Sequence, residues 1–138
     1  MAYLNIFLYF EGNCEEAFLH YKNAFGGDFK YISRYTQCPE KDKIPQEYHD
    51  KIMHIELPIS KETALKGSDW MTSDLNSDKK NSFSISVIAQ SRDEADKLFI
   101  KLSAEGKVKQ PMTDMFWGDY FGQFTDKFGV NWIILCSK

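Results

Sequence analysis

Apolar residues along the chain fall into short runs that predict eight β-strands. Some runs alternate with polar residues, as half-buried strands do, and others are nearly continuous. Residues 126–129, Asp-Lys-Phe-Gly, have turn composition and join the last two runs in a predicted hairpin. In the last run, Trp132 shares its parity with Ile134 and Cys136 and is predicted to lie in the core. The predicted strands cover residues 3–10, 29–36, 53–58, 63–68, 82–87, 107–111, 119–125 and 130–136.

Two stretches with apolar residues at helical spacing predict one helix in each half of the chain. Asn13 and Glu16 form a capping-box-like pair before the first helix, and the glycines at 26–27 can end it. Ser91 and Glu94 form a full capping-box pattern before the second helix. A shift of 78 residues places the first helix on the second, so the sequence contains a weak internal repeat.

The repeat predicts two units of similar element order, residues 1–68 and 82–138, joined by a polar linker at 69–81. Together they form one predicted domain of the α+β class, which a length of 138 residues allows. Residues 37–51 are polar and contain two prolines, so we expect a long loop there. Long ordered loops are often functional.

Charge and cysteine content argue against several classes of protein. The formal net charge is −3 and the basic residues are scattered, so we expect no nucleic-acid partner. No apolar run is long enough to span a membrane and no signal-peptide pattern opens the chain, so we expect a cytoplasmic protein without a membrane partner. Cys14, Cys38 and Cys136 lack CxxC spacing and a nearby histidine pair, which predicts reduced thiols rather than disulfides or a zinc site.

Several segments together resemble one known family. They are Phe10 to Ala17 with Tyr21, Phe25-Gly26-Gly27, Met53-His54-Ile55, Gly67-Ser68-Asp69, Trp117-Gly118 and Asp126 to Trp132. As a group they resemble the vicinal oxygen chelate superfamily, and within it the PhnB-like, glyoxalase/bleomycin-resistance-related proteins. The resemblance implies a glyoxalase-like fold, in which paired βαβββ modules form a curved mixed sheet around a cavity, usually in a homodimer.

The resemblance also bears on metal binding. In metal-dependent members, each module supplies two ligands, typically His, Gln or Glu, from strands 1, 4, 5 and 8. A divalent ion needs several carboxylates or imidazoles at about 2 Å, and a lysine ammonium nearby would repel it. The matching positions here hold Asn5, Ala64 and Lys66, Ser82 or Ser84, and Ile133. We therefore predict neither a bound metal nor another cofactor.

A small-molecule ligand in the cavity is a further implication of the resemblance. His54 and Glu56 lie two apart on one predicted strand, so they could form an acid/base pair or hold the ligand, or else bond to neighbouring strands at the sheet rim. Trp117 and Tyr120 could line the pocket with flat rings, or pack in the core and a dimer contact. Ser84 could face the cavity or solvent. The expected cavity residues are Asn5, Tyr9, His54, Glu56, Ser84, Trp117 and Tyr120.

The sequence thus favours a PhnB-like protein that binds a small molecule without the usual catalytic metal, and it leaves open whether any reaction is catalysed. It has no GxSxG serine, no glycine-rich phosphate loop and no dinucleotide motif. One alternative is a metal-dependent lyase, dioxygenase or antibiotic-resistance enzyme of the same superfamily. Another is a protein that sequesters its ligand without chemistry, as bleomycin-resistance relatives do. Metal content separates the first alternative from the others.

Overall fold

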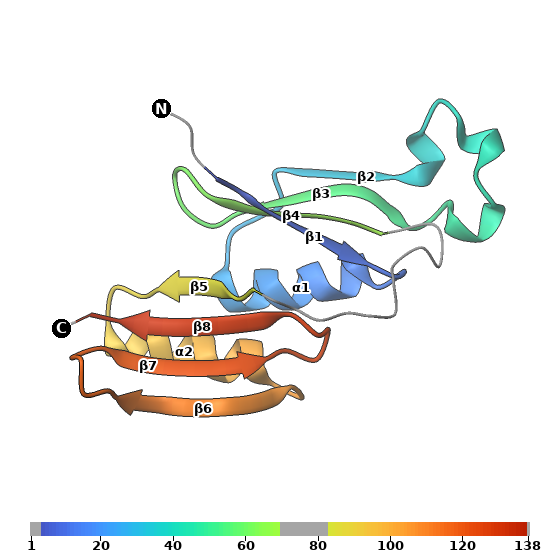
Figure 1. Ribbon diagram of the computed structural model, residues 1–138. Coiled ribbons are helices and arrows are strands. Elements are labelled where there is room, and N and C mark those ends of the chain that lie inside the picture. Colours follow the sequence, from blue (N-terminus) through green and yellow to red (C-terminus); the bar gives the residue numbers. More distant parts are fainter. Residues whose placement is uncertain (1–3, 70–82, 138) are drawn as a thin grey trace. The chain divides into compact units, whose positions relative to one another are not determined.

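Each half of the chain folds into a four-stranded mixed sheet with one α-helix (Figure 1). The computed structural model describes residues 4–69 and 83–137. The chain divides into two compact units, Met1–Ser77 and Asp78–Lys138. In both units one strand precedes the helix and three strands follow it, so the predicted α+β class with βαβββ units is confirmed.

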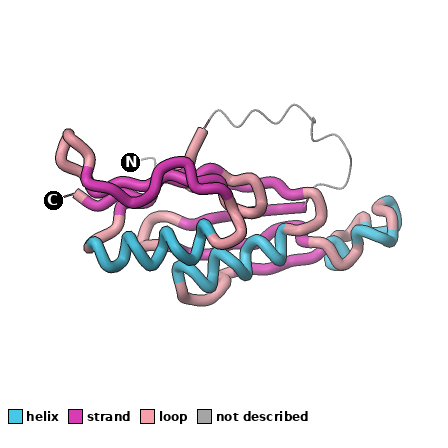
Figure 2. Tube along the Cα trace, turned by 90° about the horizontal axis from the view of Figure 1, so that it is seen from below, coloured by secondary structure: helices cyan, strands magenta, loops and turns pink. Residues whose placement is uncertain are grey.

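The first unit has strand order β1-β4-β3-β2, with β1 parallel to β4 and the other neighbours antiparallel. Helix α1 packs on one face of this sheet (Figure 1). The elements are β1 (Ile6–Phe10), α1 (Cys14–Phe25), β2 (Tyr31–Arg34), β3 (Ile52–Pro58) and β4 (Ala64–Asp69). The predicted long loop between β2 and β3 holds three short 3-10 turns (Figure 2), at Tyr35–Gln37, Lys41–Lys43 and Gln46–Tyr48.

The second unit repeats this topology with strand order β5-β8-β7-β6. Strand β5 runs parallel to β8, and the remaining neighbours are antiparallel. The elements are β5 (Ile85–Ile88), α2 (Arg92–Ser103), β6 (Lys107–Asp114), β7 (Tyr120–Thr125) and β8 (Asn131–Cys136). Both ends of α2 lie 78 residues after the corresponding ends of α1, as the repeat predicted. Within the described residues, no helix is long and apolar enough to cross a membrane.

Two glycines let each helix lie close against its sheet. A Cβ atom on Gly67 of β4 would lie 2.5 Å from the ring of Phe18, and one on Gly122 of β7 would lie 2.7 Å from the ring of Phe99. Such distances are far inside van der Waals contact, so a side chain at either position would push the helix away. The absence of a side chain at these two glycines therefore determines how closely each helix packs against its sheet.

The hairpin at the end of the chain forms as predicted. Strand β7 pairs antiparallel with β8, and Phe124 lies opposite Trp132. Both rings are fully buried, which confirms the core position of Trp132. In the turn, Asp126 accepts hydrogen bonds from the backbone N–H groups of Phe128 and Val130, both at 2.9 Å, and Gly129 adopts the positive φ of 89° that the turn requires.

The two helices begin in different ways. Ser91 accepts a hydrogen bond from the Glu94 N–H at 3.1 Å, so the predicted cap of the second helix is confirmed. The predicted cap of the first helix is wrong, because the Asn13 side chain makes no capping hydrogen bond. Asp69 at the end of β4 instead accepts a hydrogen bond from the N–H of Cys14, the first residue of α1. Strand β4 extends one residue into the predicted linker. Residues 70–81 of that linker lie outside the described residues.

Asp69 is the buried residue that joins three segments of the first unit. Its Oδ1 accepts hydrogen bonds from the backbone N–H groups of Gly12 and Cys14, and its Oδ2 accepts one from Ile52, all at 2.9 Å. The side chain is 1% exposed. Burial, and secondly the charge of Asp69, raise the pKa of the Cys14 thiol well above its ordinary value. The thiol therefore stays protonated and acts as a core residue.

Candidate functional site

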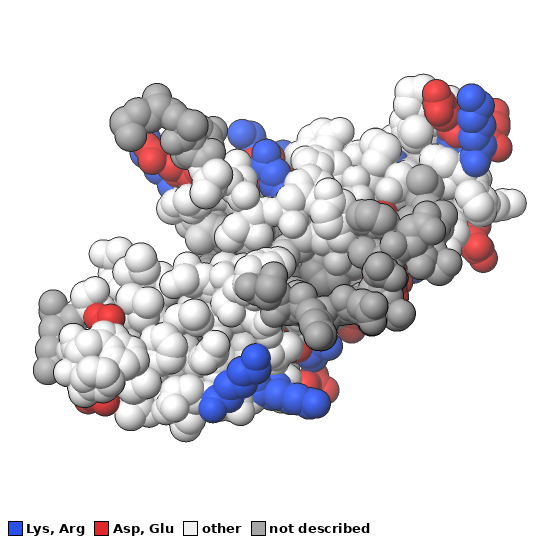
Figure 3. All heavy atoms as spheres, in the orientation of Figure 1, with Lys and Arg blue, Asp and Glu red and all other residues white. Residues whose placement is uncertain are grey.

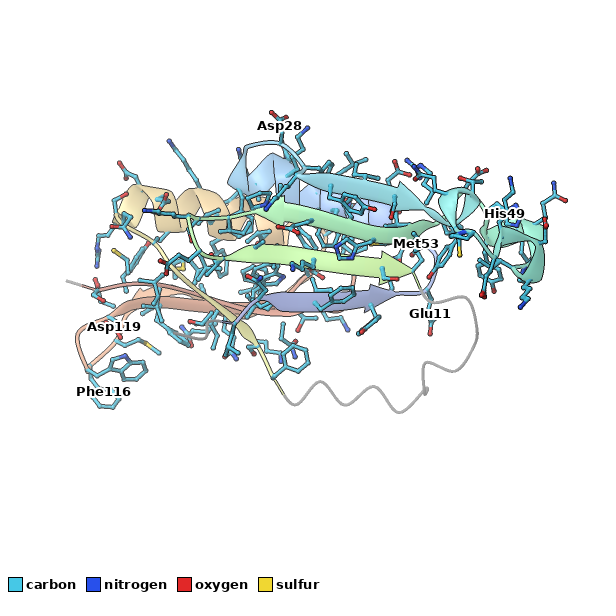
Figure 4. The ribbon with its side chains drawn as sticks, turned by 90° about the horizontal axis from the view of Figure 1, so that it is seen from above. Glu11, Asp28, His49, Met53, Phe116 and Asp119 are labelled. Carbon is cyan, nitrogen blue, oxygen red and sulfur yellow. The ribbon has the colours of Figure 1, made fainter. Side chains whose placement is uncertain are left out.

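One face of the first sheet is turned away from α1. Side chains alternate along a strand, and Leu8, Ile55 and Leu57 are buried among the core residues of this unit. The residues between them therefore point to the opposite side, towards the viewer in Figure 4. We call this side the open face and define it by the side chains of Phe7, Tyr9, Tyr31, Ser33, His54, Glu56, Lys66 and Ser68.

The strand register sets four of these side chains in a row across the sheet. Phe7 of β1 pairs with Lys66 of β4, Lys66 pairs with Glu56 of β3, and Glu56 pairs with Tyr31 of β2. Paired residues on neighbouring strands lie on the same face within reach of each other. The row thus has an aromatic ring at each end and two opposite charges in the middle.

The other four residues form the polar part of the open face. Tyr9 pairs with Ser68, and His54 pairs with Ser33. The hydroxyl of Ser33 is buried and has no hydrogen-bond partner, the one such side-chain atom among the described residues. A buried hydroxyl without a partner is destabilising by about 1–3 kcal/mol. Such a group in a folded protein often marks a functional position.

Aromatic contacts connect these residues. The His54 ring centroid lies 5.7 Å from that of Phe7 and 5.4 Å from that of Tyr31, and Phe7 lies 5.1 Å from Tyr9. The rings of Phe7, Tyr9 and Tyr31 are nevertheless 40%, 53% and 50% exposed. A set of rings that touch one another and still face outward can accept a flat molecule.

The charges of the open face are only loosely paired. Glu56 lies 3.9 Å from the Lys66 ammonium and 4.0 Å from that of Lys30, distances too long for hydrogen bonds. The Lys30 side chain is 71% exposed, so its pairing is weak in water. Two ammonium groups around one carboxylate give the centre of this face an excess of positive charge.

A second feature of the first unit is a hollow of about 290 Å³ near the start of α1. The bulge after Ser33 turns Arg34 towards Glu15, where the guanidinium donates to both carboxylate oxygens at 2.9 and 2.7 Å. This pairing lowers the pKa of Glu15. Lys51 donates to the Gly12 carbonyl at 3.0 Å. These contacts hold the β2–β3 loop to the helix, and nothing in the sequence pattern indicated them.

Four of the expected cavity residues lie in the first unit, and three of them share the open face. Tyr9, His54 and Glu56 point to it, and both Tyr9 and His54 contact Phe7. Asn5 precedes β1, and its side-chain oxygen accepts a hydrogen bond from the Ala64 N–H at 3.1 Å, which holds the start of β1 to β4. Contact of these residues with a ligand remains a prediction.

The other three expected residues lie in the second unit and do not share one environment. Ser84 precedes β5 and is half-buried. Trp117 lies in the turn between β6 and β7, next to Phe116, which Figure 4 labels. It is 52% exposed, and its N–H donates to Asp119 at 3.1 Å. Tyr120 is an even number of residues from the buried Phe124 on β7, so both point to the same side of the sheet. The Tyr120 hydroxyl donates a hydrogen bond to Asp96 of α2 at 2.5 Å, which raises the pKa of Tyr120.

Tyr120 is held further by Arg92 of α2, whose guanidinium lies 4.1 Å from the centre of the tyrosine ring and pairs with Asp114. These contacts give the tyrosine a structural role between the sheet and its helix. We therefore leave it out of the candidate site. Parity with Gly122 and Phe124 was the signal in the sequence that favoured the helix side.

The described residues do not suit a divalent metal. No group of three or more His, Cys, Asp or Glu side chains within the described ranges could hold an ion. On the open face, the middle of β4 offers the ammonium of Lys66, and the oxygen of Asn5 already accepts from Ala64. A lysine ammonium repels a cation, so we derive no chemistry through a metal here.

Charged side chains on the visible surface are intermixed rather than segregated. Figure 3 shows Lys and Arg beside Asp and Glu at several places, including the projecting loop between β2 and β3. Elsewhere in the first unit, Arg34 at the end of β2 pairs with Glu15 of α1, and Lys22 of α1 pairs with Asp28, which follows the helix, at 3.5 Å. The charge of this surface is largely balanced locally.

Comparison with known proteins gives one family. Residues 3–134 match the model of the Glyoxalase/Bleomycin resistance protein/Dioxygenase superfamily. Protein YjdN of Escherichia coli (strain K12) is 31% identical in an alignment 146 residues long, gaps included. The alignment covers 98% of this chain and 95% of YjdN.

Two solved structures are also similar. Protein PA1353 from Pseudomonas aeruginosa has a TM-score of 0.86 and 35% identity, covering 99% of this chain and 98% of its own. A putative 3-demethylubiquinone-9 3-methyltransferase, PhnB protein, from Bacillus cereus has a TM-score of 0.79 and 23% identity, covering 99% and 100%, and this likeness concerns the fold. The resemblance inferred from the sequence motifs is confirmed. The chain belongs to the glyoxalase/bleomycin resistance protein/dioxygenase superfamily.

Proposed function

We propose that the protein binds a small organic molecule on the open face of its first unit, without a resident divalent metal. The observation that carries this proposal is the row formed by Phe7, Lys66, Glu56 and Tyr31, in which exposed rings flank polar groups. Small-molecule sites typically combine apolar and aromatic walls with a few polar groups that fix orientation. Membership of a superfamily whose members bind small molecules supports the same function.

His54 and Glu56 are the groups of this face that suit proton transfer. Each is two residues from the other on β3, and neither makes a side-chain hydrogen bond within the described part of the chain. An imidazole and a carboxylate free of strong partners can act on a bound molecule as acid and base.

The binding proposal is tested by a screen of small aromatic fragments, followed by two-dimensional amide NMR. We expect fragments that bind to shift signals of the open face on β1, β3 and β4. The Phe7→Ala substitution should lower the affinity for these fragments about tenfold, because an aromatic contact is lost. Leu19→Ala is the matched control, since Leu19 is 52% exposed on α1 of the same unit. Fragment binding that is equal in both variants, or shifts that avoid the open face, would contradict the proposal.

For metal content, we expect far less than one equivalent after incubation with zinc, nickel, manganese or iron and dialysis. The donor positions of the superfamily hold unsuitable residues here, and losing several ligands removes both the charge and the geometry that select an ion. Elemental analysis measures this, with thermal unfolding in parallel. Near-stoichiometric metal that disappears in His54→Ala or Glu56→Ala would overturn the expectation and favour a metal-dependent lyase, dioxygenase or resistance enzyme.

We also propose that the protein is a homodimer. Strands β1 and β2 of the first sheet, and β5 and β6 of the second, each pair on one side only among the described strands. Open edges and exposed apolar side chains such as Leu4 and Ile32 are commonly covered by a symmetric partner. Light scattering at micromolar concentration should give twice the 16.1 kDa of one chain. A mass of one chain would contradict the dimer.

A further inference from the structure

We infer that the ligand of the open face is a planar organic anion, a flat ring system that carries a carboxylate or a comparable acidic group. This inference rests on the proposed function, because it concerns the same face and names the chemical class of its ligand. It is carried by polar groups whose hydrogen-bonding capacity is unused among the described residues and which lie between exposed rings.

Lys66 is the first of these groups. Its side chain is only 30% exposed, and its partner Glu56 lies 3.9 Å away, beyond hydrogen-bond distance. The ammonium makes no hydrogen bond to any described residue. An ammonium has three donors, and removing it partly from water is unfavourable unless acceptors replace that water. An acidic group of a ligand would supply such acceptors at the centre of the face.

The local balance of charge also favours an anion. Glu56 is 17% exposed and is shared by Lys66 and Lys30, at 3.9 and 4.0 Å. Lys66 belongs to the open face and Lys30 reaches its Glu56 from the position before β2, so the two ion pairs together leave one positive charge in excess. A ligand with one negative charge would neutralise that excess, whereas a cationic ligand would meet two ammonium groups.

Two further donors lie beside the charged row. The hydroxyl of Ser33 is buried without a partner, and Ser33 pairs across the strands with His54. The His54 ring has aromatic neighbours on both sides and no hydrogen bond within the described residues. A hydroxyl and an imidazole N–H can each donate a hydrogen bond to an acceptor. Carboxylate oxygens accept several such bonds and are suited to this set.

The rings define the body of the ligand. Phe7 and Tyr31 stand at the two ends of the row, three strand spacings apart, which is about 14 Å. A molecule of two fused rings fits within this length and can contact a ring at one end while its acidic group reaches Lys66. Stacked and edge contacts with aromatic side chains favour a flat shape over a branched aliphatic one.

The experiment uses two probes of the same shape, 2-naphthoate and the neutral 2-naphthamide, in NMR titrations of the full chain. We expect 2-naphthoate to bind the open face at least about tenfold more tightly. Lys66→Met should weaken 2-naphthoate about tenfold to a hundredfold and leave 2-naphthamide unchanged, since only the charged probe loses a charge-assisted bond. Lys66→Arg should retain most of the affinity, and Glu56→Gln should raise it about twofold to fivefold.

Melting curves of each variant show whether the sheet is intact, and Lys66→Arg keeps the test decisive if Lys66→Met fails to fold. Equal affinity for the two probes, or an equal effect of Lys66→Met on both, would contradict the inference that the ligand is an anion. The proposed binding function would then still stand. If neither probe binds, the inference of an anionic ligand is also contradicted. The fragment screen then tests separately whether the open face binds a small molecule. Opposite effects of Lys66→Met and Glu56→Gln on 2-naphthoate alone are the expected result.

Discussion

Replacing Asp69 with alanine is expected to destabilise the first unit by about 3–5 kcal/mol, because three backbone N–H groups, two of them in buried hydrogen bonds, lose their acceptor at once. Those groups belong to Gly12 and Cys14 at the start of α1 and to Ile52 at the start of β3, all at 2.9 Å. Asp69 is 1% exposed, so in the folded unit its carboxylate, and not bulk water, is the acceptor for these groups. Urea unfolding followed by far-ultraviolet circular dichroism measures the loss.

Two further variants show whether the hydrogen bonds are responsible. Asp69→Asn keeps one side-chain oxygen and places an amide opposite the Ile52 N–H, so its loss should be smaller than that of alanine but still clear. Asp28→Ala removes a carboxylate that is 94% exposed and should change stability by less than about 0.5 kcal/mol. A loss below about 1 kcal/mol for Asp69→Ala would show that this network is not what holds the three segments together.

Local patterns were sufficient for much of the fold. The helical spacing of apolar residues predicted both α1 and α2. The two helices are separated by 78 residues in the sequence, as the repeat indicated. The final hairpin could be predicted because turn chemistry at Asp126 and Gly129 acts over a few residues. Strand ends differed from the predicted ones by up to three residues, since pairing partners, which are distant in sequence, decide where a ladder stops.

The role of Asp69 could not be inferred from its neighbourhood. It opens a stretch of Ser, Asn, Lys and Asp residues, so composition placed it in a linker. Its partners are 17 to 57 residues away in the chain and come within reach because β4 lies between β1 and β3 in the sheet. Asn13 had the right residue type for a cap, but its side chain makes no capping hydrogen bond, and a buried carboxylate from another strand accepts a hydrogen bond from the N–H of Cys14, the first residue of the helix.

The candidate site could be predicted only in part for a similar reason. The two-residue period placed His54 and Glu56 on one face, and Tyr9 on a face with Phe7. The importance of Tyr31, Ser33 and Lys66 depends on the register of three strands, which no local pattern contains. Their residue types alone did not distinguish them from ordinary half-exposed strand positions.

Replacing Trp132 with alanine is expected to destabilise the second unit by about 3–5 kcal/mol, because a fully buried aromatic side chain leaves a large cavity. Trp132 pairs with Ile85 on one side and Phe124 on the other, so the cavity would lie in the middle of the sheet. The indole N–H also donates to Asp126 at 2.9 Å. The truncation therefore removes one of the hydrogen bonds that hold the β7–β8 turn carboxylate in place.

A set of three variants separates these effects in denaturant titrations. Trp132→Phe loses the hydrogen bond and part of the volume, so we expect a smaller loss of about 1–3 kcal/mol. Trp117→Ala is the control for removing a tryptophan, because Trp117 is 52% exposed in the β6–β7 turn and should cost less than about 1 kcal/mol. A loss under 1 kcal/mol for Trp132→Ala would mean that the indole is exposed in solution and that β8 does not form the centre of this core.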